Sequence, residues 1–381
     1  MKFEQLTLIE PLLQAIHKKG YLNPTPIQEK TIPIILQGQD LFGVAQTGTG
    51  KTAAFALPIL QLLTTDRDRN QRRDVRALIL APTRELASQI SEEFYVYSKG
   101  LNIKLLTVYG GVSQRPQTQA LQKGIDIMVA TPGRLLDLIH QGFINLNRIE
   151  YFVLDEADRM LDMGFINDIR KIIAKLPSRK QTMLFSATTS PEVRNMASSI
   201  LVNPQTVNLA PVASPPSLVS QKVYHVSQEN KKLLLAHLLQ DELVKQALVF
   251  TRTKRGAEKV VKDLTRQGIK ADAIHGDKSQ NAREKALKAF KNHSIRVLVA
   301  TDVASRGIDV DKLSHVINFE IPEEAETYVH RIGRTGRAEQ LGAALSFCSG
   351  NERSYLKNIH KLIKHPIDVV HSHPFATIFK N

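Results

Sequence analysis

The sequence of 381 residues is 42% hydrophobic and 23% charged, a globular composition long enough for two domains, which excludes a disordered, collagen-like or coiled-coil chain. Its 51 Lys and Arg residues against 37 Asp and Glu residues give a net charge of +14, which favours a polyanionic partner but indicates no chemistry. A single cysteine, Cys348, excludes disulfide frameworks and cysteine-rich zinc sites. The chain has no apolar run of the ~18 residues that a membrane helix needs and no signal-peptide pattern at its start, so we expect a cytoplasmic protein without membrane association.

Strand-like apolar runs alternate with helical stretches along the chain, a pattern typical of parallel sheets covered by helices. In the first half the runs are Asp40–Ala45, Arg76–Ala81, Ile103–Tyr109, Asp126–Ala130, Tyr151–Leu154 and Gln181–Phe185. The pattern breaks around residues 203–220, where the adjacent prolines Pro215 and Pro216 indicate an extended linker. It resumes at Ala247–Thr251, Lys270–His275, Arg296–Ala300, His315–Phe319 and Ala343–Phe347. We therefore predict an α/β fold with an N-terminal domain at residues 1–209, a linker at 210–217 and a C-terminal domain at 218–381.

The two halves resemble each other. The run that begins at Ala77 resembles the run that begins at Ala247, and the run ending at Thr131 resembles the run ending at Thr301, in both cases 170 residues further on. Any two buried parallel strands can look alike, but equal offsets in the same order favour two similar domains.

A Gly-rich segment follows the first strand and opens the helical run Ala53–Leu63. It reads Ala45-Gln46-Thr47-Gly48-Thr49-Gly50-Lys51-Thr52. Its backbone N–H groups and the helix N-terminus can cradle phosphates, Lys51 can reach the β- and γ-phosphate oxygens, and the Thr52 hydroxyl can ligate Mg²⁺. The usual pattern has Gly at the position of Ala45, but the strand–loop–helix context is intact. The segment predicts binding of a nucleoside triphosphate.

Three acids follow the strand Tyr151–Leu154: Asp155, Glu156 and Asp158. We assign Asp155 to Mg²⁺ and Glu156 to orienting and deprotonating the attacking water. Acids after a strand also often cap the next helix, a role that suits Asp158. Together with the phosphate loop, the acids favour hydrolysis over binding alone.

The second half supplies candidate arginines in His330-Arg331-Ile332-Gly333-Arg334-Thr335-Gly336-Arg337. Arg334 and Arg337 are suited to stabilise the charge of a transferring phosphoryl group. Basic Gly-rich loops are more often simply solvated. The phosphate site in the first half needs an arginine finger and has no other obvious candidate. We therefore predict this role for Arg334 and Arg337.

These motifs together resemble the DEAD-box ATP-dependent RNA helicases, whose name spells Asp155-Glu156-Ala157-Asp158, and the resemblance extends from Phe3 to about Leu362. It implies two tandem RecA-like domains, each a mostly parallel sheet flanked by helices, with ATP and Mg²⁺ as cofactors. The string Gly20-Tyr21-Leu22-Asn23-Pro24-Thr25-Pro26-Ile27-Gln28 resembles the adenine-reading motif, which implies that Tyr21 stacks on the base and Gln28 reads its edge.

The resemblance also implies contacts to RNA, mainly through its backbone and with little sequence specificity. In the first domain they involve Pro82, Thr83, Arg84, Gly111, Thr131, Gly133 and Arg134, and in the second Thr251, Gly276, Arg283 and Thr301. Gly307 and Asp309 would contact ATP, and Asp158, Ser186, Thr188 and His330 would couple hydrolysis to unwinding or join the domains. The hydroxyls of Ser186 and Thr188 would equally suit a helix cap. Ser305 and Arg252 depart from the usual family residues.

We therefore expect an ATP-dependent RNA helicase that separates strands locally rather than processively. Two alternatives are an ATP-gated RNA clamp and a DNA helicase on the same fold. The brevity of the chain weakly suggests the RhlE-type bacterial branch, and we expect a monomer. The sequence identifies neither the physiological RNA nor any ribonucleoprotein, degradosome or ribosome-assembly partner.

Overall fold

The computed structural model describes residues 2–46, 48–65, 73–209, 219–302, 313–336, 342–363 and 365–377. Contacts within the chain group these residues into two compact units, one up to residue 209 and one from residue 219 onwards. The predicted linker at residues 210–217 lies outside the described residues.

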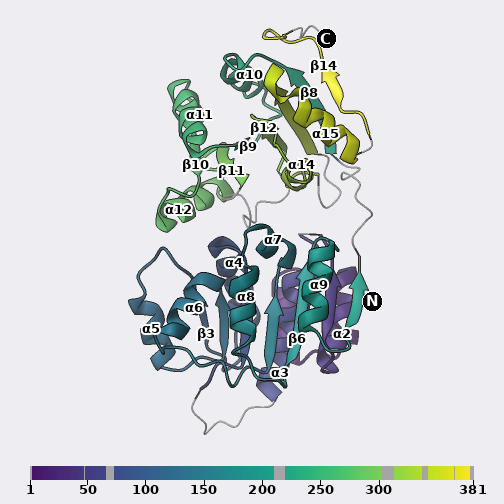
Figure 1. The fold of residues 1–381 in the computed structure, drawn as a ribbon, viewed down its shortest axis with the longest axis vertical. Coiled ribbons are helices and arrows are strands. Elements are labelled where there is room, and N and C mark those ends of the chain that lie inside the picture. The colour runs from purple at the N-terminus through teal and green to yellow at the C-terminus, as the bar shows by residue number, and fades with distance from the viewer. Residues whose placement is uncertain are drawn as a thin grey trace. The chain divides into compact units, whose positions relative to one another are not determined.

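The first unit is a seven-stranded parallel sheet with helices on both faces (Figure 1). The strand order is β3-β4-β2-β5-β6-β1-β7. The strands are β1 (Leu41–Val44), β2 (Ala77–Leu80), β3 (Leu105–Val108), β4 (Ile127–Ala130), β5 (Tyr151–Leu154), β6 (Gln181–Ser186) and β7 (Gln205–Asn208). The helices are α1 (Glu10–Lys18), α2 (Pro26–Leu36), α3 (Lys51–Thr65), α4 (Arg84–Tyr97), α5 (Arg115–Gln122), α6 (Pro132–His140), α7 (Ala157–Asp162), α8 (Ile166–Ile173) and α9 (Pro191–Ile200).

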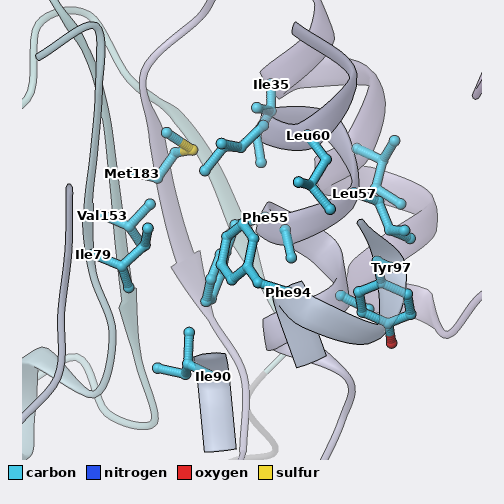
Figure 2. Close-up of a cluster of buried hydrophobic side chains, with 14 of the residues drawn as sticks. Ile35, Phe55, Leu57, Leu60, Ile79, Ile90, Phe94, Tyr97, Val153 and Met183 are labelled. Atoms are coloured by element: carbon cyan, nitrogen blue, oxygen red, sulfur yellow. The ribbon is translucent and has the colours of Figure 1, made fainter. Parts of the chain in front are cut away.

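Both faces of this sheet are buried, which is why its strands read as continuous apolar runs. On one face Ile79 and Val153 pack with helices α1 to α4, and on the other Leu78 and Phe152 pack with helices α6 to α9. Figure 2 shows the first of these cores, where the ring of Phe55 on α3 lies between the strands and α4. Its centroid is 6.1 Å from that of Phe94.

The second unit repeats this architecture with strand order β10-β11-β9-β12-β13-β8-β14, again all parallel. The strands are β8 (Val219–His225), β9 (Ala247–Thr251), β10 (Ala271–Ile274), β11 (Val297–Thr301), β12 (His315–Asn318), β13 (Gly342–Cys348) and β14 (Asp368–Val370). The described helices are α10 (Lys231–Leu238), α11 (Lys254–Arg266), α12 (Gln280–Lys291), α14 (Ala325–Ile332) and α15 (Arg353–Ile363). Each strand occupies the place of its counterpart in the first sheet, in agreement with the repeat seen in the sequence.

A buried ion pair lies at the start of α10. Lys231, the first residue of that helix, is fully buried, and its Nζ donates to a carboxylate oxygen of Glu352 and to the carbonyl oxygen of Phe319. Burial lowers the pKa of the Lys231 ammonium, and the adjacent Glu352 carboxylate opposes that shift.

The strands β7, β8 and β14 were absent from the runs predicted by the sequence, and β7 corrects the break placed at residues 203–220. In β7 only Val207 is buried, because the strand lies at the edge of the sheet. In β8 three consecutive polar residues that are not buried, Ser220 to Lys222, interrupt the buried positions. Neither strand therefore has the continuous apolar run used to identify the others. Among the described helices, none is long and apolar enough to cross a bilayer.

Candidate active site and nucleic-acid interface

The residues predicted to act in the first unit follow the carboxyl ends of its parallel strands. The phosphate loop follows β1, the acids follow β5, and Ser186 ends β6, and these three strands are neighbours in the order β5-β6-β1. The predicted RNA contacts follow β2, β3 and β4, which are neighbours in the order β3-β4-β2. The strand order thus separates a candidate nucleotide site from a candidate RNA site along one edge of the sheet.

The phosphate loop turns through two glycines in the left-handed region, Gly48 at φ 80° and Gly50 at φ 89°. Lys51 begins α3 and is buried, with its Nζ donating to the carbonyl oxygen of Ala45 at 2.9 Å. The Thr49 hydroxyl donates to the carbonyl oxygen of Gln46 at 2.7 Å. The loop is therefore folded on itself, with a lysine charge at its centre. The predicted ligand Thr52 is the second residue of α3, and Thr47 lies outside the described residues.

The adenine-reading motif contacts this loop. Gln28 is 3% exposed; its Oε1 accepts from the Thr25 N–H at 2.9 Å, and its Nε2 donates to the carbonyl oxygen of Gly50 at 3.1 Å. A Cβ atom at Gly50 would overlap that Nε2, so glycine is needed there for close approach as well as for its φ. Tyr21 is 41% exposed, and Lys19 Nζ lies 5.6 Å from its ring centroid. Its ring thus has accessible surface on which a base could stack.

Asp155 is buried at the end of β5, where its Oδ1 accepts from the Glu156 N–H at 3.0 Å. Burial raises the pKa of its carboxyl group to about 6; the Lys51 ammonium opposes the shift, and the charges of Glu156 and Asp158 add to it. A divalent cation would stabilise the ionised form. Carboxylate and hydroxyl oxygens are the ligands that Mg²⁺ prefers, and the residue types of Asp155 and Thr52 therefore fit this ion.

Glu156 has an uncommon backbone conformation for a residue with a side chain, φ 54° and ψ 52° in the left-handed region, as the residue that precedes α7. Such strain often accompanies a functional site. Its buried carboxylate accepts a hydrogen bond from Arg159 Nη1 three residues later, one turn along α7. Sequence reasoning missed Arg159, although its spacing of three residues on a helix was a usable signal.

Asp158 and Ser186 connect the loops after β5 and β6. Asp158 Oδ2 accepts from the Ala187 N–H at 3.0 Å, and Ser186 Oγ accepts from the Thr188 N–H at 3.2 Å. The capping alternatives are not observed, because Glu156 precedes α7 and Ser190 caps α9. Asp158 therefore joins the acidic loop to the segment predicted to couple hydrolysis to unwinding.

Two guanidinium groups lie beside a pair of glycines at the edge of the first sheet that carries the predicted RNA contacts. A Cβ atom at Gly111, whose φ is 77°, would overlap the guanidinium of Arg84, and one at Gly110 would lie 3.9 Å from Arg84 Nη2 and 4.0 Å from Arg134 Nη2. Thr83 caps α4 by accepting from the Leu86 N–H. Pro82 precedes Thr83, and Thr131 precedes α6, in whose first turn Gly133 lies. The predicted contacts of this unit are thus gathered into one cationic, glycine-lined edge.

The second unit gathers its predicted RNA contacts in the equivalent place. Thr251 and Thr301 end the adjacent strands β9 and β11 and pair in register, and Gly276 follows β10 on the other side of β11. Arg283 lies in the second turn of α12. The unusual Arg252 is held by acids: its N–H donates to Glu320 at 2.7 Å, and its Nη2 donates to Glu352 at 3.2 Å.

A second ion pair that sequence reasoning missed joins two of the motifs in this unit. Arg331 is 2% exposed and forms two parallel hydrogen bonds to Asp302, at 2.6 and 2.7 Å, directly after Thr301. Arg331 lies beside His330 in α14, and Arg334 is buried just beyond that helix. Gly307, Asp309 and Arg337 lie outside the described residues, as does Ser305.

Comparison with known proteins identifies the family. Residues 25–196 match the DEAD/DEAH box helicase family, and residues 230–339 match the helicase conserved C-terminal domain. The chain is 43% identical over 364 residues to the ATP-dependent RNA helicase CshA of Limosilactobacillus reuteri, an alignment that covers 96% of this chain and 72% of that protein. The chain belongs to the DEAD-box ATP-dependent RNA helicases.

Further comparisons agree. A DEAD-box ATP-dependent RNA helicase CshA of Bacillus cereus is 45% identical over 368 residues, covering 96% of this chain and 69% of that protein. Among solved structures, a DEAD box protein from the hyperthermophile Methanococcus jannaschii is 41% identical with a TM-score of 0.55, covering 97% of this chain and 99% of that one. S. cerevisiae Dbp5 bound to RNA and ADP BeF3 is 30% identical with a TM-score of 0.85, covering 97% and 95%.

These findings confirm the predicted fold class of two tandem RecA-like domains and the prediction of an ATP-hydrolysing RNA helicase with RNA as its partner. They favour the helicase over the RNA clamp and the DNA helicase. The similar bacterial proteins carry the name CshA, and the RhlE-type branch stays a prediction.

Proposed function

We propose that this helicase hydrolyses ATP at the ends of β1, β5 and β6, with Lys51, Asp155 and Glu156 as the principal groups. The observation that carries the proposal is the convergence of a buried lysine, a buried acid whose pKa responds to that lysine, and a second carboxylate in a strained backbone. Lys51 would exchange its bond to the Ala45 carbonyl oxygen for a phosphate oxygen.

We propose Mg²⁺ as the cofactor, held by Asp155 and the Thr52 hydroxyl. The ion would neutralise charge on the β- and γ-phosphates. Asp155 must be ionised to bind it, and its raised pKa predicts that binding weakens as the pH falls through about 6.

Glu156 is proposed as the general base for the attacking water. Its strained backbone and its bond to Arg159 fix the carboxylate, and one carboxylate oxygen remains to accept a water proton. Gln28 and Tyr21 would hold the adenine, and the hydrogen bond from Gln28 to the Gly50 carbonyl oxygen would couple adenine binding to the phosphate loop. Arg334 and Arg337 stay proposed as the arginines that stabilise the transferring phosphoryl group.

RNA is proposed to bind along the strand ends of β2, β3 and β4 in the first domain and of β9, β10 and β11 in the second. Such contacts would hold the backbone without reading bases. We propose that strand separation is local and non-processive. Because each domain carries proposed contacts to ATP and to RNA, binding of either ligand should tighten binding of the other by the same factor. We retain the domain bounds 1–209 and 218–381, a cytoplasmic location and a monomeric state as proposals.

The test is Glu156→Gln, with the exposed Asp162→Asn, at the end of the helix that follows Glu156, as the control. We expect RNA-stimulated hydrolysis to fall at least ~100-fold in Glu156→Gln while ATP and RNA still bind, and to be unchanged in the control. Hydrolysis that survives in Glu156→Gln would refute the assignment. Displacement of a short duplex, with matched RNA and DNA oligonucleotides, measures the helicase activity itself.

A further inference from the structure

The outer face of α11 carries a row of four exposed cations, Arg255, Lys259, Lys262 and Arg266. They are spaced by four, three and four residues, which places them in one line along a helix. The opposite face of α11 buries Ala257, Val260 and Leu264 against the second sheet. The row therefore faces away from the core of its domain.

Most of this charge has no counter-ion among the described residues. Arg266 pairs with Asp263 at 3.8 Å, whereas Arg255, Lys259 and Lys262 form no hydrogen bond or ion pair with any other described residue. The nearby acid Glu258 is engaged elsewhere, with His275 at 2.7 Å and with Lys278 at 3.6 Å.

The like charges within the row repel one another. Three successive pairs of like charges lie three or four residues apart, and each such pair destabilises a helix by about 0.2–0.5 kcal/mol. The first turn of α11 contains no acidic residue to compensate the positive end of the helix dipole. A polyanion bound along this face would remove both costs.

The position of α11 links the row to the proposed RNA contacts. The helix begins three residues after Thr251 ends β9, at the edge that also carries Gly276 and Thr301. From Arg255 to Arg266 the row extends about 17 Å along the helix, away from that edge. No large exposed apolar side chain lies on α11, which favours a backbone polyanion over a protein partner.

We propose that the outer face of α11 is an RNA-backbone site that holds the part of the RNA extending beyond the strand-end loops. The proposal rests on the proposed RNA contacts of the second domain and extends them. Its contacts are to phosphates, so the site adds affinity for longer RNA without adding sequence specificity.

The test compares two full-length triple variants with the same change in charge. One is Arg255→Gln/Lys259→Gln/Lys262→Gln on α11, and the control is Lys285→Gln/Lys288→Gln/Lys291→Gln on α12, where these three lysines are also exposed. Binding of uridine oligomers of increasing length is measured by fluorescence anisotropy at several salt concentrations, with a non-hydrolysable ATP analogue present. Thermal unfolding should show that neither triple variant is less stable.

For long oligomers, the α11 variant should lower the slope of log affinity against log salt by about 2, because each lost phosphate contact to a single strand contributes ~0.7. This change in slope corresponds to a loss of tenfold to about 100-fold in RNA affinity at 0.1 M salt. The shortest oligomers that bind should be unaffected, and the α12 variant should lose little at any length.

Three results would overturn the proposal: equal losses for both variants, an equal loss at every oligomer length, or no loss with the α11 variant. No loss with the α11 variant would instead indicate that the outer face of α11 binds an acidic protein partner. Failure of the strand-end assignment is a separate result, since Arg84→Gln and Arg134→Gln would then leave short-oligomer affinity intact.

Discussion

Replacing Asp155 by Asn is predicted to stabilise the first domain while removing its activity. The carboxyl group is 2% exposed, and burial raises its pKa from 3.8 to about 6. At pH 7 the folded protein must therefore keep a carboxylate ionised where ionisation is unfavourable. An Asn side chain has the same shape without the charge, and its Oδ1 can still accept from the Glu156 N–H.

The sign and size of this effect follow from proton linkage. Between pH 3.8 and about 6 the folded domain binds more protons at this group than the unfolded chain does, so its stability falls as the pH rises through that window. For Asp155 alone the loss is about 1–2 kcal/mol at pH 5 and about 3 kcal/mol at pH 7. The stability difference between Asp155→Asn and the original protein should therefore be about 1 kcal/mol larger at pH 7 than at pH 5.

The assay is urea unfolding of the full chain at both pH values. The two domains can unfold separately, so the transition to follow is the one that an ATP analogue with Mg²⁺ shifts in the original protein. The exposed Asp162→Asn serves as the control for removing a carboxylate outside the buried site. Comparing each variant with its parent at the same pH cancels the titration of all other groups.

A difference between Asp155→Asn and its parent that is equal at the two pH values, or larger at pH 5, would refute the reasoning. It would mean that burial does not oppose ionisation of the Asp155 carboxyl group. The Asp155→Asn variant should also lose the stabilisation that Mg²⁺ adds to nucleotide binding, which an independent titration measures.

Three further variants test individual contacts. Arg159→Ala should lower turnover about tenfold at unchanged KM for ATP and have no further effect on Glu156→Gln, a double-mutant cycle that steady-state kinetics can complete. Gly111→Ala should lower RNA affinity about tenfold, because residue 111 has a left-handed backbone conformation and its new Cβ would displace the Arg84 guanidinium. ATP binding without RNA, measured in parallel, should not change. Arg331→Ala removes the guanidinium that bonds Asp302, Asn318 and the Glu320 carbonyl oxygen, and it should destabilise the second domain by about 3 kcal/mol in urea unfolding; a loss below ~1 kcal/mol would contradict that.

The chemistry-bearing loops could be read from the sequence because they are local. The phosphate loop and the acids after β5 each lie within a few residues of a buried parallel strand, and such strands are continuous apolar runs. The strand order β5-β6-β1 then brings Lys51 and Asp155 close together, although they are far apart in the sequence.

Other features could not be read in this way. The pair of Arg331 and Asp302 joins two distant segments, and no local spacing announces it. The conformation of Glu156 depends on how β5 meets α7, not on residue type, since a bulky residue rarely adopts positive φ. Edge strands such as β7 bury so little that their sequence is nearly that of a loop.

The buried pair of Lys231 and Glu352 has a consequence for how many nucleotides the chain can hold. Lys51 and Lys231 are the first residues of the helices that follow β1 and β8, two strands with the same place in their sheets. In the first domain that ammonium is bonded to a neutral carbonyl oxygen, which a phosphate oxygen can replace. In the second domain the ammonium of Lys231 is paired with the carboxylate of Glu352, which is part of the protein itself. The two similar domains thus differ by one carboxylate, which in the second domain takes the place proposed for an ATP phosphate in the first.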